Sequence, residues 1–341
     1  MTCTLLADGL IASTEIVRRL LIAAFGTVEV VLVEELPRKR IESDLLFISR
    51  LCNPRLAWLP EYFRERNRPY VYFLDDNFYE LTADVDSQNA AHYSHPAVIE
   101  ALDRFIVGAA AVWVMSRPLE HYLRKRVSAA NVKYLPAPVA VAKFDQYRAA
   151  ARDAAREERN EIVIGYPTSR RLNVAPLLVD IVNGCREKYG SRVRFEFVGW
   201  CPDGLAELDT VTLFPAIPHY EDYVKFSQSR RWDIGIAPVG DSAFENCKTS
   251  LKYREYGAAR IAGVYSDVPL FGESVQHGVT GLLAGNDPQH WLDALTSLIE
   301  RPELRDRIAQ AAYVDVLQFH EENAVAHLVH DAFAPLVWHQ S

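Results

Sequence analysis

The chain has 341 residues, of which 49% are hydrophobic and 24% charged, and its formal net charge is −8 at pH 7. This length exceeds the usual size of a single hydrophobic core, so we expect two domains of an ordinary globular protein. The acidic charge balance argues against nucleic acid as a partner, and no apolar run reaches the roughly 18 residues of a membrane-spanning helix.

The N-terminus and the cysteines indicate a cytoplasmic protein. Residues 1–13 lack the basic region of a signal peptide. The five cysteines include no C-x-x-C pair and are odd in number, which argues against a disulfide framework or a zinc site. Short basic clusters at 37–40, 64–68 and 124–126 are typical of solvated faces. They also fit an anionic surface, so the expected location includes a peripheral contact at the inner membrane face.

The first part of the chain alternates apolar runs with amphipathic segments. Continuously apolar runs rich in β-branched residues are typical of strands in a parallel sheet covered on both faces. The predicted strands of this part are 3–7, 28–33, 44–49, 70–74, 111–115 and 132–136. We therefore expect a Rossmann-like domain over residues 1–146.

The second part repeats this alternation after a polar segment at 147–161, which we interpret as a linker or linking helix. Its predicted strands are 162–166, 193–199, 211–215, 232–239, 261–266 and 281–285. They define a second Rossmann-like domain over 162–320, followed by a helical tail at 321–341 that could pack back on the first domain. The expected fold is α/β, with two doubly wound domains facing a central cleft that holds the ligand.

Two arginines mark the loop after the first strand of the second domain. No G-x-G-x-x-G motif follows the first strand of either domain, which argues against a nicotinamide enzyme. The loop IGYPTSRRLN at 164–173 offers hydroxyl groups and the pair Arg170 and Arg171 instead. Such a loop between a strand and a helix suits contacts with phosphate.

Two lysines flank a predicted helix start in the stretch ENCKTSLKYREYG at 245–257. Ser250 is expected to cap the helix, whose end carries partial positive charge that disfavours lysine. Lys248, Lys252 and Glu255 are spaced to share one helical stripe. The two ammonium groups, with the amides near Ser250 and Leu251, would hold an anion, and Glu255 could accept two hydrogen bonds from a ribose diol. In the alternative interpretation the lysines only pair with Glu245 and Glu255.

Two stretches of the sequence carry a pattern of a known family. The residues of the longer one are Phe244, Lys248, Leu251, Lys252, Glu255, Tyr256, Glu273, Val275, Gly278, Thr280, Gly281, Leu282 and Leu283, and the other is RPYVYFLDDNFYEL at 68–81. With these residues the second domain resembles the C-terminal half of glycosyltransferase family 4-like enzymes of the GT-B fold, most strongly from about 232 to 310. The branch it matches is common in bacterial cell-surface polysaccharide clusters.

This resemblance implies a hexosyl or related transferase that moves a sugar from a nucleotide diphosphate sugar to an acceptor hydroxyl. Transfer in the family usually proceeds with retention and without a metal or other cofactor. The nucleotide would bind the second domain, and a saccharide or lipid-linked saccharide acceptor would bind the first. The glutamate that holds the ribose falls on Glu255. The first glutamate of the family's pair falls on Cys247, and Glu245 could compensate only through a different loop path.

Two adjacent aspartates follow an apolar strand of the first domain. Asp75 and Asp76 are expected at the carboxyl end of that strand, facing the cleft. In the family that the chain resembles, a His or Asp at this place contacts the donor sugar or the acceptor. The resemblance therefore implies Asp75 and Asp76, together with Lys252, as the catalytic residues. The predicted donor-binding residues are Arg170, Arg171, Lys248, Ser250, Leu251, Lys252 and Glu255, with no metal. Paired carboxylates could also bind a divalent metal or cap the next helix.

Two other functions remain open at the level of the sequence. A nucleotide-sugar epimerase or hydrolase of similar fold would turn over the donor without an acceptor. A non-catalytic nucleotide-sugar-binding module of a polysaccharide-assembly complex would bind the donor only, and the incomplete glutamate pair favours that alternative. The leading prediction is a glycosyltransferase of surface polysaccharide, lipopolysaccharide or glycolipid synthesis.

Overall fold

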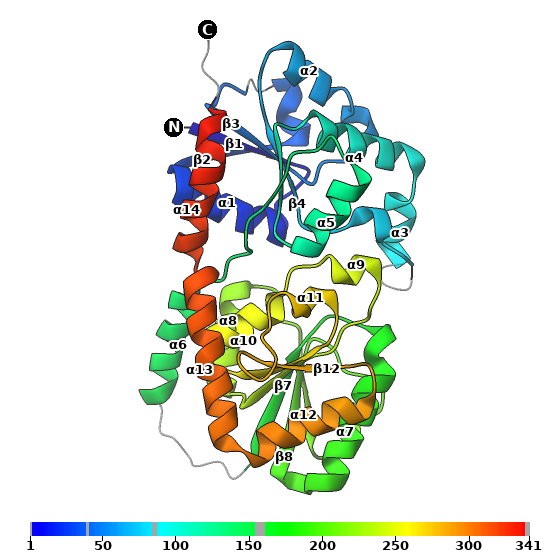
Figure 1. Ribbon diagram of the computed structural model, residues 1–341, viewed down its shortest axis with the longest axis vertical. Coiled ribbons are helices and arrows are strands. Elements are labelled where there is room, and N and C mark those ends of the chain that lie inside the picture. Colours follow the sequence, from blue (N-terminus) through cyan, green and yellow to red (C-terminus); the bar gives the residue numbers. More distant parts are fainter. Residues whose placement is uncertain (1, 39–40, 84–86, 154–160, 338–341) are drawn as a thin grey trace. The chain divides into compact units, whose positions relative to one another are not determined.

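The structure, a computed structural model, describes residues 2–38, 41–83, 87–153 and 161–337. The chain divides into two compact units. The first comprises Met1–Pro138, Asn246–Thr249 and Glu322–Ser341, and the second comprises Val139–Glu245 and Ser250–Glu321. Each unit is built on its own parallel sheet (Figure 1).

The sheet of the first unit has the strand order β2-β1-β3-β4-β5-β6, with every neighbouring pair parallel. Its strands are β1 Thr2–Ala7, β2 Thr27–Leu32, β3 Leu45–Ser49, β4 Val71–Leu74, β5 Ala111–Val114 and β6 Val132–Tyr134. Its helices are α1 Ala12–Phe25, α2 Leu59–Glu65, α3 Ser87–Tyr93, α4 Pro96–Gly108, α5 Arg117–Arg126 and α14 Glu322–Phe333.

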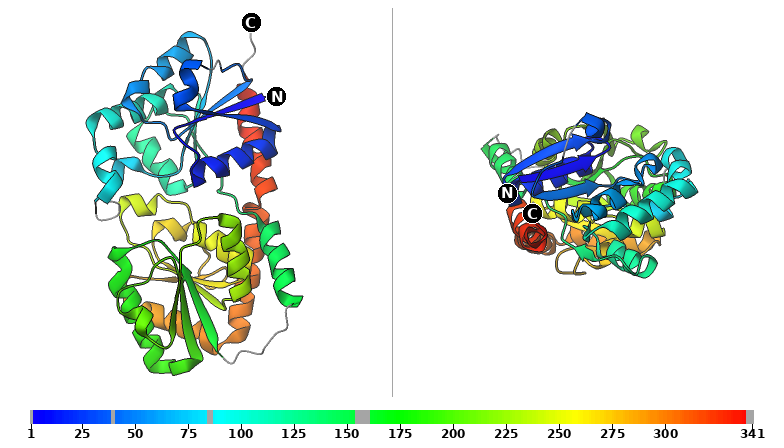
Figure 2. Two further views of the ribbon diagram at one scale, coloured as in Figure 1. Left: turned by 180° about the vertical axis from the view of Figure 1, so that it is seen from behind. Right: turned by 90° about the horizontal axis from the view of Figure 1, so that it is seen from above.

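The apolar runs of β1, β3, β4 and β5 are buried on both faces of the sheet, whereas the edge strands β2 and β6 are only partly buried. One face packs against α4 and α5 through residues such as Tyr72 and Phe105. The other packs against α1 and α14, where Phe333 meets Phe47 and Trp113. Helix α14, red in Figures 1 and 2, lies beside α1 and thus completes the core of this unit although it is distant in sequence.

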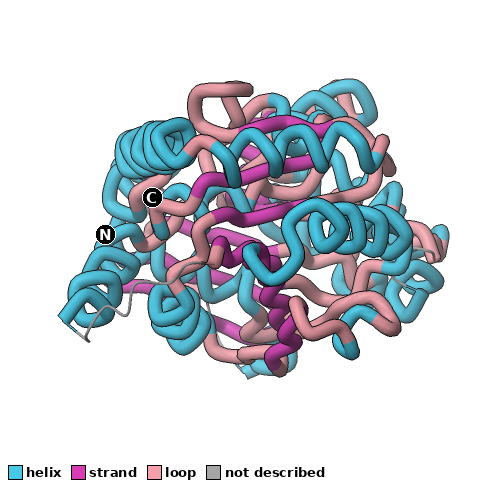
Figure 3. Tube along the Cα trace, turned by 90° about the horizontal axis from the view of Figure 1, so that it is seen from below, coloured by secondary structure: helices cyan, strands magenta, loops and turns pink. Residues whose placement is uncertain are grey.

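The sheet of the second unit has the order β12-β11-β10-β7-β8-β9, again with parallel neighbours. Its strands are β7 Ile162–Pro167, β8 Val193–Val198, β9 Val211–Phe214, β10 Ile234–Ala237, β11 Ala262–Ser266 and β12 Leu282–Ala284. Its helices are α6 Val141–Asp153, α7 Ala175–Tyr189, α8 Tyr220–Arg230, α9 Ala243–Asn246, α10 Leu251–Ala259, α11 Pro269–Gly272, α12 Pro288–Glu300 and α13 Pro302–Phe319. Figure 3 shows strands enclosed between helices, which is the layering that buried parallel strands require.

The predicted strands are confirmed in type and order, with ends that differ by at most two residues. The segment predicted as a linker at 147–161 begins within helix α6, which starts at Val141 and buries Val141 and Phe144 in the core of the second unit. Residues 154–160 of that segment lie outside the described residues.

The basic clusters have mostly structural partners. Of the cluster at 37–40, residues 39–40 lie outside the described residues. In the cluster at 64–68, Arg68 is buried and donates to the backbone oxygens of Ile41 and Ser43. In the cluster at 124–126, Arg124 pairs with Glu120. Within the described ranges, no helix is both long and apolar enough to cross a bilayer.

A glycine on β7 allows an indole ring to pack flat on the sheet. A Cβ atom at Gly165 would lie 2.1 Å from the Trp232 ring, and that ring is held by its Nε1–H, which donates to Glu196 Oε2 at 2.8 Å. Gly165→Ala should lower the free energy of unfolding by roughly 1–3 kcal/mol, the usual cost of overpacking a core. Urea unfolding followed by fluorescence measures it. Gly272→Ala, where a Cβ meets nothing within 4 Å, is the control, and equal stability of both variants would contradict the packing account.

Candidate functional site

A pocket lies at the carboxyl end of the second sheet, where the strand order reverses between β7 and β10. The chain runs from β7 outward through β8 and β9 and then returns to β10 on the other side, so the loops after β7 and β10 diverge. Ligands of doubly wound sheets bind at such a switch point. The pocket has a volume of about 410 Å³ and is lined by Tyr166, Pro167, Thr168, Ser169, Arg171, Val198, Gly199, Ala216, Ile217, Tyr223, Ala237, Val239, Leu251, Lys252 and Glu255.

Glycine at the end of β8 allows two of these loops to approach each other. Gly199 has a φ of +93°, and a Cβ there would lie 2.6 Å from the carbonyl oxygen of Thr168. Thr168 in turn donates its amide to Val198 at 2.9 Å. A side chain at position 199 would therefore push apart the loops that form the base of the pocket.

A buried carboxylate on α10 forms one wall of the pocket. Glu255 is 2% exposed, and its Oε2 accepts from Lys252 Nζ at 2.8 Å and from the Tyr223 hydroxyl at 3.1 Å. Burial, and then the nearby Glu255 charge, raise the pKa of Tyr223 well above its usual range, so the hydroxyl stays protonated and donates. Among the described residues Oε1 has no hydrogen-bond partner, which leaves this oxygen for a ligand.

The start of α10 only partly follows the sequence prediction. The helix begins at Leu251, so Lys248 does not share a helical stripe with Lys252 and Glu255, and that expectation is wrong. The expected Ser250 side-chain cap is also absent from the described structure. Its hydroxyl lies 2.8 Å from that of Ser274 instead. The first-turn amides of α10 still lack helical acceptors, because no earlier turn precedes them.

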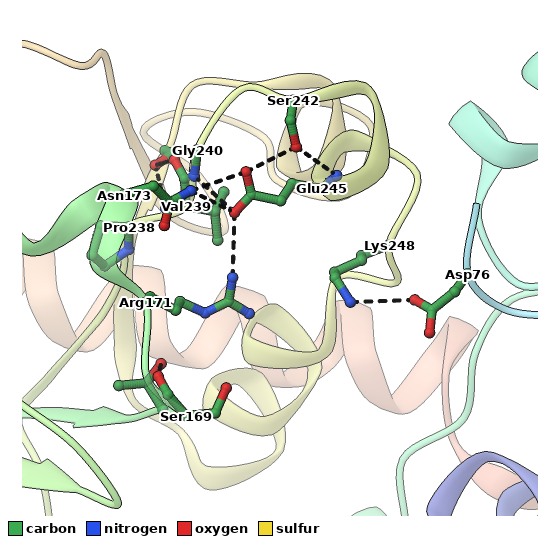
Figure 4. A network of polar contacts seen from close by, with 12 residues as sticks. Asp76, Ser169, Arg171, Asn173, Pro238, Val239, Gly240, Ser242, Glu245 and Lys248 are labelled. Atoms are coloured by element: carbon green, nitrogen blue, oxygen red, sulfur yellow. Dashed lines mark hydrogen bonds and ion pairs between the residues drawn. The ribbon is translucent and has the colours of Figure 1, made fainter. Parts of the chain in front are cut away.

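The two arginines after β7 lie in different environments. Arg171 lines the pocket, and its Nη1 lies 3.4 Å from Glu245 Oε1 (Figure 4). Arg170 is exposed and is not among the lining residues. Glu245 also accepts from Asn173 and Ser242. Among the described residues its cationic partner is Arg171 and not a lysine.

A second polar cluster belongs to the first unit. Asp75 and Asp76 directly follow β4, and Arg50 directly follows the neighbouring β3. Arg50 Nη1 lies 2.8 Å from Asp75 Oδ1 and 3.5 Å from Asp76 Oδ2. Lys248 Nζ lies 3.3 Å from Asp76 Oδ1 (Figure 4). The predicted residues Asp75, Asp76 and Lys248 are thus brought together here, whereas Arg171, Leu251, Lys252 and Glu255 line the pocket.

Arg50 was not predicted from the sequence and adopts an unusual backbone conformation. Its φ of +57° lies in the left-handed region, which costs a non-glycine residue about 1–3 kcal/mol. Its amide donates to Phe73 at 2.9 Å, and its guanidinium lies over the Phe78 ring. Burial and then the charge of Asp76 raise the pKa of the Asp75 carboxyl, while Arg50 acts in the opposite direction.

Cys247 occupies the position where the resemblance expects a glutamate. Its thiol is 4% exposed and packs in the core of the first unit, where Asn77 Nδ2 donates to its sulfur at 3.4 Å. Burial raises the pKa of this thiol. It cannot supply the hydrogen bonds of a carboxylate. In the part of the chain that is described, no group of three His, Cys, Asp or Glu side chains could hold a metal ion.

Solved structures share this architecture over nearly the whole chain. Sucrose-phosphate synthase from Thermosynechococcus elongatus superposes with a TM-score of 0.73 at 15% identity, covering 98% of this chain and 99% of that one. HepE from Anabaena, in complex with UDP, gives 0.72 at 14% identity, covering 98% and 100%. A glycosyltransferase from Rickettsia africae gives 0.62 at 12% identity, covering 98% of each. The chain has the GT-B fold. No family model and no curated protein matches its sequence.

In this GT-B protein, two residues near the pocket escaped the sequence analysis, and a third, Glu245, was not expected to contact Arg171 and Asn173. Tyr223 could not be found, because a tyrosine on an amphipathic helix carries no signal of its partner. Asn173 lies in the arginine loop, where an amide side chain is common. Glu245 has a readable signal, since Ser242-x-x-Glu245 is the pattern of a capping box, and Glu245 N donates to Ser242 Oγ at 3.2 Å.

The ion pair inside the pocket predicts the effect of removing Lys252 on stability. Lys252→Ala should lower the free energy of unfolding by roughly 1–3 kcal/mol, because the buried Glu255 carboxylate keeps only Tyr223 as a donor. The double variant Lys252→Ala/Glu255→Gln should regain most of this loss. Thermal and urea unfolding provide the measurement.

Lys143→Ala is the matched control, because it breaks an exposed lysine–glutamate pair with Glu221 and should change stability by less than about 1 kcal/mol. The account fails if Lys252→Ala and Lys143→Ala are equally stable.

Proposed function

We propose that this protein is a glycosyltransferase that moves a sugar from a nucleotide diphosphate sugar to an acceptor hydroxyl. The observation that carries this proposal is the pocket at the β7/β10 switch point. Arg171, Lys252 and Glu255 all line it, and Glu255 Oε1 has no hydrogen-bond partner among the described residues. Two cations suit a diphosphate, and the carboxylate oxygen suits a ribose diol.

The pocket fits the parts of such a donor. Its volume of about 410 Å³ is that of a small-molecule site. Val198, Ala216 and Ile217 provide an apolar wall against which a base can pack. The amides at the start of α10, beside Leu251, complement the cations in holding phosphate. Crystal structures of HepE with UDP and with UDP-glucose support a nucleotide-sugar donor by likeness of fold.

Transfer breaks the bond between the anomeric carbon and the β-phosphate oxygen and forms a bond from that carbon to the acceptor oxygen. The electron pair of the broken bond leaves with the diphosphate, whose negative charge grows in the transition state. Arg171, Lys252 and the α10 amides would stabilise this charge, so we propose transfer without a metal or other cofactor. Retention at the anomeric carbon belongs to the same proposal.

Asp75 and Asp76 are the proposed acceptor-side residues. The proton of the acceptor hydroxyl must be removed as the new bond forms, and Asp76 carries a carboxylate next to Lys248 for this purpose. The acceptor would be a saccharide or a lipid-linked saccharide of surface polysaccharide, lipopolysaccharide or glycolipid synthesis. The expected location is the cytoplasm, with a peripheral contact at the inner membrane face.

The burial of Cys247 favours a second candidate function. Without a carboxylate at this position the donor sugar loses one expected contact, as in a non-catalytic nucleotide-sugar-binding module of an assembly complex. Such a module would bind the donor and show no turnover with any acceptor. An epimerase or hydrolase of similar fold would turn over the donor in the absence of any acceptor.

Glu255→Gln tests the assignment of the ribose site. The affinity for UDP, measured by calorimetry, should fall roughly tenfold or more, because a charge-assisted hydrogen bond contributes about 1.5–3 kcal/mol. Affinity for pyrophosphate should stay equal or rise, since Lys252 loses its partner. GDP and ADP should be compared with UDP to identify the base.

Glu221→Gln, which changes an exposed carboxylate to the same amide, serves as the control. If Glu255→Gln lost affinity for UDP and for pyrophosphate equally, the assignment of the ribose to Glu255 would be wrong. Failure of the wild-type chain to bind any nucleoside diphosphate would overturn the proposed function.

Metal removal tests the proposed charge stabilisation. Nucleotide-sugar turnover in the presence of EDTA should match that of the untreated protein, because Arg171 and Lys252 supply the positive charge that a divalent ion would otherwise supply. The measurement is release of the nucleoside diphosphate. Complete loss of turnover with EDTA and its recovery with Mg²⁺ or Mn²⁺ would mean that a metal ion, and not these side chains, neutralises the diphosphate.

A further inference from the structure

The carboxylate of Glu245 is buried and fully engaged. It is 2% exposed, and its oxygens accept from several donors around it (Figure 4). These donors are Arg171 Nη1 at 3.4 Å, Asn173 Nδ2 at 3.1 and 3.2 Å, the Gly240 amide at 3.3 Å and Ser242 Oγ at 3.0 Å. A carboxylate offers about four lone-pair positions, so these contacts leave none for a sugar hydroxyl.

The backbone around Glu245 is shaped to permit this arrangement. A Cβ atom at Gly240 would lie 2.4 Å from Glu245 Oε2 and 2.5 Å from Asn173 Nδ2. Any side chain at position 240 would therefore displace the carboxylate or the amide. Burying a charge this deeply is costly unless it is paired, and the charged member of the set that reaches it is Arg171.

Arg171 connects this cluster to the pocket. Its side chain is 26% exposed and lines the pocket, while its Nη1 contacts Glu245. A guanidinium carries five N–H donors in a rigid fork, and within the described structure only Nη1 has a hydrogen-bond partner. The remaining donors are left for an anion. Arginine has considerable rotamer freedom, so holding one edge in advance lowers the entropy lost on binding.

We propose that Glu245 is a positioning residue for Arg171. It holds one edge of the guanidinium so that the other edge meets the diphosphate of the donor. This inference rests on the proposed function. It also gives Glu245 a role different from that of a glutamate that reads the donor sugar, because Glu245 acts through Arg171 and does not touch the donor.

A double-variant cycle with UDP as the probe tests this role in the full-length chain. Glu245→Gln keeps the shape of the side chain but removes the charge that holds Arg171, and UDP affinity should fall about tenfold. Arg171→Met should lower UDP affinity at least as much. The double variant should bind UDP no more weakly than Arg171→Met alone. Uridine, which lacks phosphate, should bind equally to all of them.

Ser242→Ala is the matched control, since it removes a neutral contact to the same carboxylate and leaves the ion pair. It should change UDP affinity less than twofold. If Ser242→Ala loses as much as Glu245→Gln, the cluster serves only to hold the loop. Independent losses in the double variant would overturn the proposal, as would tighter UDP binding by Glu245→Gln, since Glu245 would then weaken the site.

Arg171→Lys provides a second measurement should Glu245→Gln not fold. A lysine keeps the charge but cannot present one edge to Glu245 and another to UDP, so affinity should fall nearly as far as in Arg171→Met. Full affinity in Arg171→Lys would overturn the positioning role. Absence of UDP, GDP and ADP binding by the wild-type chain would instead overturn the proposed function, and this inference with it.

Discussion

The pocket of the second unit depends on the burial of two carboxylates, Glu245 and Glu255. Each is 2% exposed, and a charge withdrawn from water this far must be compensated by donors and a counter-charge. In both cases the carboxylate accepts hydrogen bonds from neutral donors and forms an ion pair with a cation that lines the pocket. Arg171 serves Glu245 and Lys252 serves Glu255. The requirement to compensate buried charge therefore also fixes the two cations where an anionic ligand would enter.

The sheet topology explains why these groups meet. Strands β7 and β10 are neighbours, but the chain leaves them in opposite directions across the sheet. The loop after β7 carries Arg171, and the segment after β10 carries Glu245 and leads into α10. Residues 72 and 74 positions apart in sequence thus come within hydrogen-bond distance. The first unit repeats the principle on a smaller scale, since Arg50 after β3 meets Asp75 after β4.

The strands could be predicted because a strand buried on both faces of a parallel sheet must be a continuous run of apolar residues, which is visible in the local sequence. Lys252 and Glu255 could be paired because they lie three positions apart on a helix. Contacts that depend on the path of loops have no such pattern in the local sequence. Three features depend on a partner distant in sequence. They are the ion pair of Lys248 with Asp76, the contact between the hydroxyls of Ser250 and Ser274, and the left-handed backbone of Arg50. Glu245 lay between these cases, since its capping-box pattern predicts a short helix but not the ion pair with Arg171.

The positive charges at the start of α10 have a physical explanation that does not require a ligand. A helix N-terminus disfavours lysine, yet Lys252 is offset by Glu255 one turn along, and Lys248 is offset by Asp76 before the helix begins. The conflict with the helix dipole is therefore no indication of a phosphate site by itself. What indicates a site is the geometry left after these pairs have formed. Glu255 retains an oxygen, Arg171 retains most of its donors, and both line one pocket at the switch point of the sheet. A pairing that served stability alone would have no need to leave these groups open on the same cavity.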